Sequence, residues 1–491
     1  MTATAPDKES TLSARLKFLT VAGVGLFADG YLNISIGLVV PMLGYIYFND
    51  AGGALKTSDS DIVKGSLSLG MIIGQVTFGI LGDTIGRHRV YGRELIVTIF
   101  GTLMCILMPW NGLSHQGIVA WMSVWRAVTG FGIGGDYPMS STLAAERTPL
   151  GSRAKLVLSV FACIGLGTFT SSIVYLVLLS IFKDSIKQDV SHLEYVWRIL
   201  LGLGIIPCAL TVYARLMMKQ TKPWAKYVST TDGADALPTR TVRQQFRDLR
   251  VYFSDRRHAQ ALFSVCAVWF LFDIAYYGIN LNQSVILAQI GYSTATTVYG
   301  RLWNTAVGNL IAQSAGYLPG FFVGIFLPDW TGRKTQQLLG CAGAMILYAI
   351  WAGVTNHTST AGLMTVFTIS QLVLNSGPNV TTFLIPVELF PTRVRATAHG
   401  LAAASGKLGA VLTAFTFGSL TESIGIEGVL GLLSGIMFLT TALTFLIPET
   451  KGRTIEDLET DVLYTKADNH SPTKLGSPEL RGSLKEDIAK S

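Results

Sequence analysis

The sequence predicts an all-α membrane protein in which twelve transmembrane helices form two pseudo-symmetric six-helix halves. Three observations support this fold class. Of the 491 residues, 49% are hydrophobic and only 14% are charged, whereas soluble domains carry about 25% charged residues. The apolar residues gather in twelve runs, most of them near the ~20 residues that cross a bilayer as a helix. Charged motifs that follow these runs occur once in each half of the chain.

Each apolar run is interpreted as one membrane-spanning helix. The runs lie at 17–47, 62–82, 94–111, 117–145, 155–182, 197–217, 259–290, 303–328, 336–354, 361–388, 397–420 and 428–447. The longest connection, 218–258, is polar and basic, and it separates an N-terminal half, 17–217, from a C-terminal half, 259–447. We interpret 1–16 as an N-terminal tail and 448–491, which is rich in Ser, Lys and Glu, as a disordered C-terminal tail.

Basic residues alternate between the connections and predict the orientation in the membrane. The connections after spans 2, 4, 8 and 10 contain Lys or Arg, whereas those after spans 3, 9 and 11 contain neither. The positive-inside rule therefore places both tails and the central loop 218–258 in the cytoplasm. We expect a multi-pass protein of the plasma membrane, with the lipid bilayer as its surroundings.

Composition and motifs also exclude several classes of protein. The net charge of +7 arises largely from short loops between apolar runs, so we expect no nucleic-acid partner. The sequence contains no Walker-type loop, nucleophile–base pair or Cys/His cluster. We therefore expect neither an enzyme nor an ATP-driven pump, and no metal or other cofactor.

Acid–base motifs recur at equivalent positions in the two halves. The matching groups are Asp83 and Arg87 with Asp329 and Arg333, and Glu146 and Arg153 with Glu388 and Arg395. We interpret these residues as gates, in which ion pairs between helices hold the outward-facing state; the alternative is that they only fix the topology. Two parallel repeats around a site at mid-membrane are typical of transporters that alternate between two states.

Two segments resemble signatures of a known superfamily. Gly79-x-x-x-Asp83-x-x-Gly86-Arg87-His88-Arg89 follows span 2, and Pro448-Glu449-Thr450-Lys451-Gly452-Arg453 follows span 12. They resemble the loop 2–3 motif of the major facilitator superfamily and the end of span 12 in its sugar-porter members. The resemblance implies the major facilitator fold.

A narrower resemblance lies in spans 4, 10 and 11. The segments Gly134-Gly135-Asp136-Tyr137-Pro138, Asn379-Val380-Thr381-Thr382-Phe383 and Ala398-His399-Gly400 resemble the phosphate:proton symporters of fungi and plants. In that family phosphate lies between the two halves, and the matching positions here are Tyr137, Trp269, Asp273, Tyr277, Asn379 and Lys407. Proton movement is assigned to positions that match Asp29, Asp136 and Asp273, with Glu94 on the cytoplasmic exit route.

The residue types fit this chemistry. Trp269, Asp273 and Tyr277 are four residues apart and share one helical face, and Trp N–H and Tyr O–H groups can donate to phosphate oxygens. An anion next to Asp273 is repelled unless that carboxyl is protonated, so we expect proton and phosphate to bind together. Lys407 would attract phosphate as a point charge. Aromatic packing and a lysine that reaches the membrane surface are the alternatives.

Asp29 and Asp136 allow two interpretations. Unpaired carboxylates inside a membrane mark proton relays, which is the role we expect. The alternative is that each is structural and pairs with an arginine elsewhere in the N-terminal half.

Two departures from the family pattern leave a second substrate open. Ile164 stands where the family has a Gln in span 5, and Leu32 stands where it has a second Asp in span 1. We expect proton-coupled import of phosphate by alternating access, driven by the proton gradient. The alternatives are transport of glycerophosphodiesters or another organophosphate, and a phosphate sensor that does not transport. We expect a single chain to be functional, although the sequence does not fix the oligomeric state.

Overall fold

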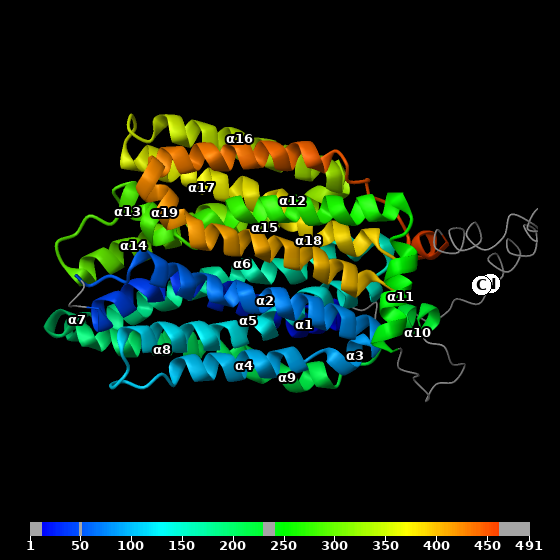
Figure 1. Ribbon diagram of the computed structural model, residues 1–491, viewed down its shortest axis with the longest axis horizontal. Helices are drawn as coiled ribbons and strands as arrows, with labels where there is room; N and C mark the ends of the chain where they lie inside the picture. The colour runs from blue at the N-terminus through cyan, green and yellow to red at the C-terminus, as the bar shows by residue number, and fades with distance from the viewer. Residues whose placement is uncertain (1–11, 49–51, 229–240, 461–491) are drawn as a thin grey trace, which may run out of the picture.

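The computed structural model describes residues 12–48, 52–228 and 241–460, which form a bundle of long helices (Figure 1). The N-terminal half contains α1 (Leu12–Tyr47), α2 (Thr57–Thr84), α3 (Arg87–Val90), α4 (Arg93–Ile106), α5 (His115–Glu146), α6 (Leu150–Ile181), α7 (Lys183–Gln188), the 3-10 turn η3 (Val190–His192), α8 (Leu193–Leu203) and α9 (Ile205–Leu216). The central connection contains α10 (Lys222–Tyr227) and α11 (Val242–Tyr252). The C-terminal half contains α12 (Arg256–Asn280), α13 (Gln283–Gln289), α14 (Val298–Ala312), the π-helical turn η4 (Gln313–Tyr317), α15 (Leu318–Thr331), α16 (Arg333–Val354), α17 (Thr360–Ser376), α18 (Pro378–Leu389) and α19 (Arg395–Thr444).

These helices coincide with the predicted spans. Within the described residues, eight helical stretches are long and apolar enough by length and composition to cross a membrane. One of them, α19, has 50 residues, and a single crossing needs only about 20. It contains both predicted spans 397–420 and 428–447. Gly425 separates these spans, because its φ of 71° and ψ of 169° lie in a region that is essentially restricted to glycine.

Two further breaks lie near the middle of the C-terminal half. The backbone of Gly377 is non-helical and separates α17 from α18, which begins with Pro378. Between α14 and α15 the helix widens into the π-helical turn η4, a feature that is frequent at functional sites. Both breaks adjoin residues that line the cavity described below.

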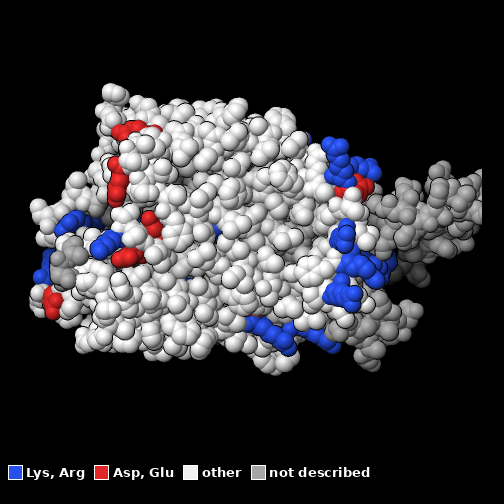
Figure 2. All heavy atoms as spheres, in the orientation of Figure 1, with Lys and Arg blue, Asp and Glu red and all other residues white. Residues whose placement is uncertain are grey.

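The two ends of the bundle differ. We call the end at which α1 begins, and where α3, α10 and α11 lie, the termini end (right in Figure 1), and the opposite end, with α7 and α13, the loop end. On the face drawn in Figure 2, the charged side chains lie toward these two ends and leave an uncharged surface between them. An uncharged belt is what a bilayer requires of the surface in contact with it.

The C-terminal tail corrects one expectation. We predicted disorder for 448–491, but 448–460 is ordered and packs on the termini end, with Ile455 and Leu458 buried. The Glu459 carboxylate accepts a hydrogen bond from the Thr392 amide at 2.6 Å. The apolar side chains within this polar segment explain why it packs. Likewise, 12–16 of the predicted N-terminal tail belongs to α1; the rest of both predicted tails, 1–11 and 461–491, lies outside the described residues.

Candidate functional site

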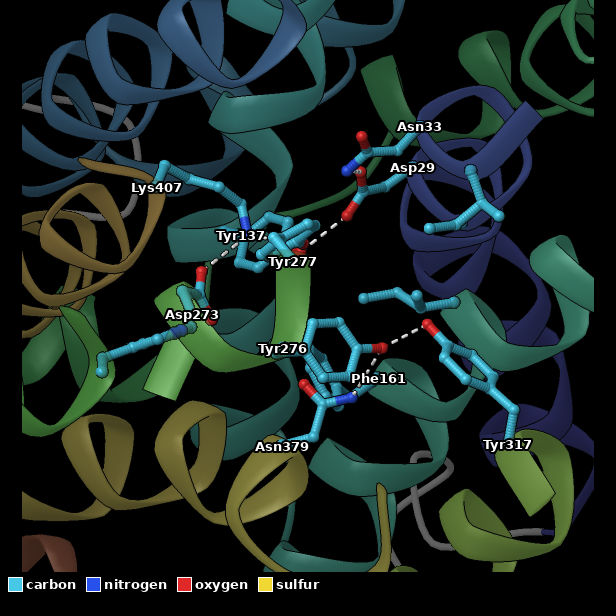
Figure 3. Close-up of a pocket in the computed structure, with 14 residues that line it drawn as sticks. Asp29, Asn33, Tyr137, Phe161, Asp273, Tyr276, Tyr277, Tyr317, Asn379 and Lys407 are labelled. Carbon is cyan, nitrogen blue, oxygen red and sulfur yellow. Dashed lines mark hydrogen bonds and ion pairs between the residues drawn. The ribbon is translucent and has the colours of Figure 1, made fainter. Parts of the chain in front are cut away.

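A small cavity lies between the two halves, near the middle of the helices (Figure 3). Its volume is about 20 Å³, room for about one water molecule. The N-terminal half lines it through α1, α5 and α6, and the C-terminal half through α12, η4, α18 and α19. The lining residues are Asp29, Gly30, Asn33, Ile34, Tyr137, Phe161, Ile164, Trp269, Asp273, Tyr276, Tyr277, Tyr317, Asn379 and Lys407. The structure therefore brings together all six positions that we predicted to bind substrate.

The positive charge of the cavity comes from Lys407 on α19. Its Nζ lies 3.3 Å from Oδ2 of Asp273 and donates a hydrogen bond to the Tyr277 hydroxyl at 2.7 Å. Gly406 makes this approach possible, because a Cβ atom there would lie 2.5 Å from Cδ1 of Trp269. Both Lys407 and Asp273 are 2% exposed. The lysine therefore stays inside the bundle and does not reach the membrane surface.

The N-terminal half contributes the carboxylate of Asp29. Its Oδ2 accepts a hydrogen bond from the Tyr137 hydroxyl at 2.6 Å, and its Oδ1 accepts one from Asn33 at 3.3 Å. Among the described residues Asp29 takes part in no ion pair. Figure 3 shows Tyr137 between the two carboxylates, with Asp29 on one side and the Lys407–Asp273 pair on the other. The cavity thus holds two carboxylates and one lysine.

A group of neutral polar side chains completes the wall. The Asn379 amide, in the first turn of α18, donates to Asn375 at 2.7 Å and to the Tyr276 hydroxyl at 3.3 Å. The Tyr276 hydroxyl also bonds to that of Tyr317. We did not predict Tyr276, Tyr317 or Asn375. A tyrosine or asparagine inside an apolar run is the only signal they carry in the sequence, and it does not separate lining from packing.

A second buried charge cluster lies within the N-terminal half, away from the cavity wall. Arg215 of α9 forms ion pairs with Glu94 of α4, at 3.1 Å, and with Asp136 of α5. Its remaining donors bond to backbone carbonyls of α1, those of Val21 and Ala22. All three charged side chains are fully buried. This cluster, like the cavity, sets two carboxylates against one cation.

The cluster bears on the two interpretations of Asp29 and Asp136, as proton relays or as structural partners of an arginine. Asp136 pairs with an arginine of its own half, as in the alternative that we considered, and Asp29 does not. Sequence analysis missed Arg215 because it lies near the end of span 197–217, where a basic residue usually marks a loop. The roles in proton movement of Asp29, Glu94, Asp136 and Asp273 stay predictions.

At the termini end, gate residues of one half contact the other. The Asp83 carboxylate of α2 accepts hydrogen bonds from the backbone amide of Thr397, at 2.7 Å, and from that of Ala396, at 3.3 Å. It thus caps the first turn of α19, where a helix favours negative charge. It also forms an ion pair with Arg87 at 3.0 Å. Arg87 in turn donates to the Thr392 carbonyl of the C-terminal half at 2.8 Å.

The other gate residues do not all pair with the partner that their sequence motif suggested. Glu146 pairs with Arg87 at 3.0 Å and, across the two halves, with Arg395 at 3.2 Å. Further contacts join Arg333 to Glu388 at 2.8 Å, Arg333 to Asp329 at 3.7 Å, and Arg153 to the Arg453 carbonyl at 3.2 Å, and Asp329 also pairs with Lys155 of the other half at 3.3 Å. The buried Glu146–Arg395 pair therefore joins an acid of the first repeat to a base of the second.

The two departures from the family pattern occupy different places. Ile164 lines the cavity, so it forms an apolar patch in a wall that is otherwise mostly polar or aromatic. Leu32 does not line it; its backbone carbonyl accepts a hydrogen bond from Arg126 at 3.4 Å. Only Ile164 can therefore contact a ligand in the cavity directly.

Comparison with known proteins identifies the family. The family model described as sugar (and other) transporter matches residues 18–462. The chain belongs to this family. A putative inorganic phosphate transporter of Schizosaccharomyces pombe is 36% identical to it, over 90% of this chain and 87% of the relative. The repressible high-affinity phosphate permease of Neurospora crassa is 35% identical, over 90% and 86%. A probable inorganic phosphate transporter of Arabidopsis thaliana is 33% identical, over 90% and 92%.

Solved structures confirm the predicted fold class. A proton:xylose symporter of the major facilitator superfamily superposes with a TM-score of 0.73, over 92% of this chain and 99% of that one. The sequence identity is 19%, so this likeness concerns the fold alone. The chain has the major facilitator fold, and its cavity lies at the interface of the two halves.

Proposed function

We propose that this chain imports inorganic phosphate together with protons by alternating access of its two halves. The observation that carries the proposal is the charge set of the cavity: Lys407 and Asp273 from one half face Asp29 from the other. The relatives named as phosphate transporters support the choice of substrate. No bound cofactor is needed, because the proton gradient supplies the energy.

The Asp273 carboxylate and phosphate compete for the same lysine. Lys407 now pairs with Asp273, and an anion in the cavity needs that positive charge for itself. Protonation of Asp273 removes its negative charge and releases Lys407, which then attracts phosphate as a point charge. The hydroxyls of Tyr137 and Tyr277 and the amide of Asn379 supply further donors. When Asp273 loses its proton on the other side of the membrane, it takes Lys407 back and repels the anion.

Proton release follows the carboxylates of the N-terminal half. Tyr137, which bonds to Asp29, is the neighbour of Asp136 in the chain, and Asp136 shares Arg215 with Glu94. Glu94 lies in the first turn of α4, on the side of the termini end. We assign these three acids to a route between the cavity and the termini end.

The gates give the proposal an orientation. The positive-inside rule assigns the termini end to the cytoplasm, so the contacts of Asp83, Arg87, Glu146 and Arg395 close the cytoplasmic side. They must break for phosphate to leave. The plasma membrane suits an importer that draws on an external phosphate supply. One chain contains the whole cavity and the gate, so we propose that a monomer is functional.

The test is uptake of radiolabelled phosphate into proteoliposomes with an imposed inward proton gradient, in competition with unlabelled glycerophosphodiesters. We expect uptake that depends on the gradient and is unaffected by the diesters. Uptake that a protonophore leaves unchanged would contradict proton coupling.

The alternative substrate has one observation in its favour. Ile164 in the cavity wall removes a polar contact and suits a larger or less charged ligand, such as a glycerophosphodiester. Uptake of the labelled diester without phosphate uptake would support it. Phosphate binding without flux of either compound would instead indicate a sensor.

A further inference from the structure

The loop end is closed by a contact of a different kind from the gate at the termini end. There Nζ of Lys64 in α2 donates a hydrogen bond to Oδ1 of Asn282, just after α12, at 2.9 Å. The contact joins the two halves, and the side chains are 5% and 3% exposed. A second cross-half bond, from Thr57 to Glu422, is exposed. A charged lysine thus closes the loop end against a neutral amide.

The charge of Lys64 is poorly compensated. Within the described residues no carboxylate oxygen lies within 4 Å of its Nζ, and the acid that faces it most directly is Asp61, one turn nearer the loop end on the same helix. A second buried cation lies at the same level: Arg126 of α5 donates to the carbonyl of Val63 at 3.1 Å. The Nη2 group of Arg126 has no hydrogen-bond partner among the described residues. Buried cations without a counter-ion are costly and mark positions where a charged ligand passes.

Lys64 is also well separated from the central cavity. It does not line the cavity, and its partner Asn282 follows the cavity residues Asp273 and Tyr277 by nine and five residues, which corresponds to about 14 and 8 Å along a helix at 1.5 Å per residue. Phosphate enclosed by the cavity residues is therefore held by Lys407 and not by Lys64. A ligand that moves between the halves from the loop end meets Lys64 first.

We propose that Lys64 is an outer phosphate-binding position and that its bond to Asn282 is the loop-end gate, an inference that rests on the proposed function. The lysine has three donors and no acceptor, and a phosphate oxygen is a stronger partner for it than a neutral amide oxygen. While phosphate occupies Lys64, the bond to Asn282 does not form. Once phosphate has moved inward to Lys407, Lys64 binds Asn282 and the gate closes behind the substrate.

Two variants separate the charge from the gate. Lys64→Gln retains a donor for Asn282 but has no charge, whereas Asn282→Ala retains the charge but removes the acceptor. The measurement is the KM for external phosphate in proteoliposomes at low and high salt. For Lys64→Gln we expect KM at low salt to rise about fivefold, the factor for one contact between unit charges in water. Its dependence on salt should weaken, because screening acts on the charge that is lost.

Asn282→Ala should behave in the opposite way. Its KM should keep the salt dependence of the wild type, while a cysteine at the neighbouring position, Leu281→Cys, should react faster with a membrane-impermeant maleimide. Lys64→Arg keeps the charge and should keep the KM within twofold, which also shows that the position tolerates substitution.

The outcomes distinguish this proposal from the proposed function. If the wild type transports phosphate and Lys64→Gln has the same KM and salt dependence, Lys64 does not bind phosphate and the inference is overturned. Unchanged maleimide labelling in Asn282→Ala would overturn the gate. If the wild type moves no phosphate, the proposed function itself fails, and the inference fails with it.

Discussion

At the scale of single residues, the contact between Lys407 and Asp273 decides how proton and anion are coupled. Their atoms are 3.3 Å apart, so the lysine is available to phosphate only when the carboxyl is neutral. Asp273→Asn mimics the protonated form. We expect this variant to retain phosphate binding and exchange across the membrane, and to lose accumulation driven by a proton gradient. Exchange and uphill uptake in the same proteoliposomes measure the two properties, and undiminished uphill uptake would contradict this role.

Arg215 leads to a prediction about stability. Removing the arginine leaves Asp136 and Glu94 buried without a counter-ion, so Arg215→Gln should lower the free energy of unfolding by about 3–5 kcal/mol. Glu94→Gln keeps the Arg215–Asp136 pair and should cost less than about 1.5 kcal/mol. Thermal unfolding in detergent compares the two variants. Equal losses would show that the cluster does not depend on charge balance.

The cluster also shows what sequence reasoning can and cannot reach. All six predicted substrate positions line one cavity. They could be predicted because residue type, helical spacing and family resemblance mark each of them in the sequence. Arg215 and Lys64 were missed because their roles depend on partners in other helices, Asp136 and Asn282. Apolar periodicity locates helices along the chain, but it does not say which faces meet. For the same reason, spacing did not indicate that Glu146 pairs with Arg395 of the other half.

At the scale of elements, the gate rests on a helix cap shared between the halves. Asp83→Asn removes the negative charge at the first turn of α19 and the ion pair with Arg87, so the termini end should open more often. We expect faster labelling of a cysteine placed at Ala396, measured from that side. The matched control is Asp329→Asn: Asp329 is the repeat equivalent and also bridges the halves, through Lys155 at 3.3 Å, but the two side chains are 30% and 47% exposed, so this pair should contribute little. A control effect as large as that of Asp83→Asn would argue against a specific gate.

The turn at Gly425, between the last two spans, allows the contribution of backbone conformation to stability to be measured. A side chain at Gly425 would be held in a strained region, which costs about 1–3 kcal/mol. Gly425→Ala should therefore lower the free energy of unfolding by this amount. Gly431→Ala, on the following helix, meets nothing within 4 Å and should be neutral or slightly stabilising, because alanine favours helices. Thermal unfolding of both variants is the measurement, and equal stability would contradict the prediction.

At the scale of the whole molecule, the cavity between the halves and the Arg215 cluster of the N-terminal half each carry the same imbalance of charge. The cavity and the Arg215 cluster each contain two carboxylates and one cation, and burying net charge in a membrane is costly. Each site is therefore neutral when one of its carboxyls is protonated. Binding of monoanionic phosphate in the cavity requires a second proton there. That proton neutralises the phosphate charge, so transport through the cavity alone moves no net charge.

The Arg215 cluster can add a further proton to each cycle, which predicts a dependence on membrane potential. If the cluster takes up a proton from the loop end and releases it at the termini end, each cycle moves one extra positive charge inward. Uptake by the wild type should then increase with an inside-negative potential set by a potassium gradient and valinomycin. Glu94→Gln leaves one carboxylate to balance Arg215, so the cluster no longer exchanges its proton. Its phosphate uptake should become insensitive to the potential, with one proton fewer per phosphate.

The control for this experiment is another buried acid of the same half. Glu194 pairs with Arg198 and accepts a hydrogen bond from Tyr47 near the loop end. It thus has a cation of its own, with which no second carboxylate of the described residues forms an ion pair. Glu194→Gln should leave the number of protons per phosphate unchanged. If Glu94→Gln keeps the voltage dependence of the wild type, the second proton does not pass through the Arg215 cluster. The two carboxylates would then serve only to hold α4, α5 and α9 together around the arginine.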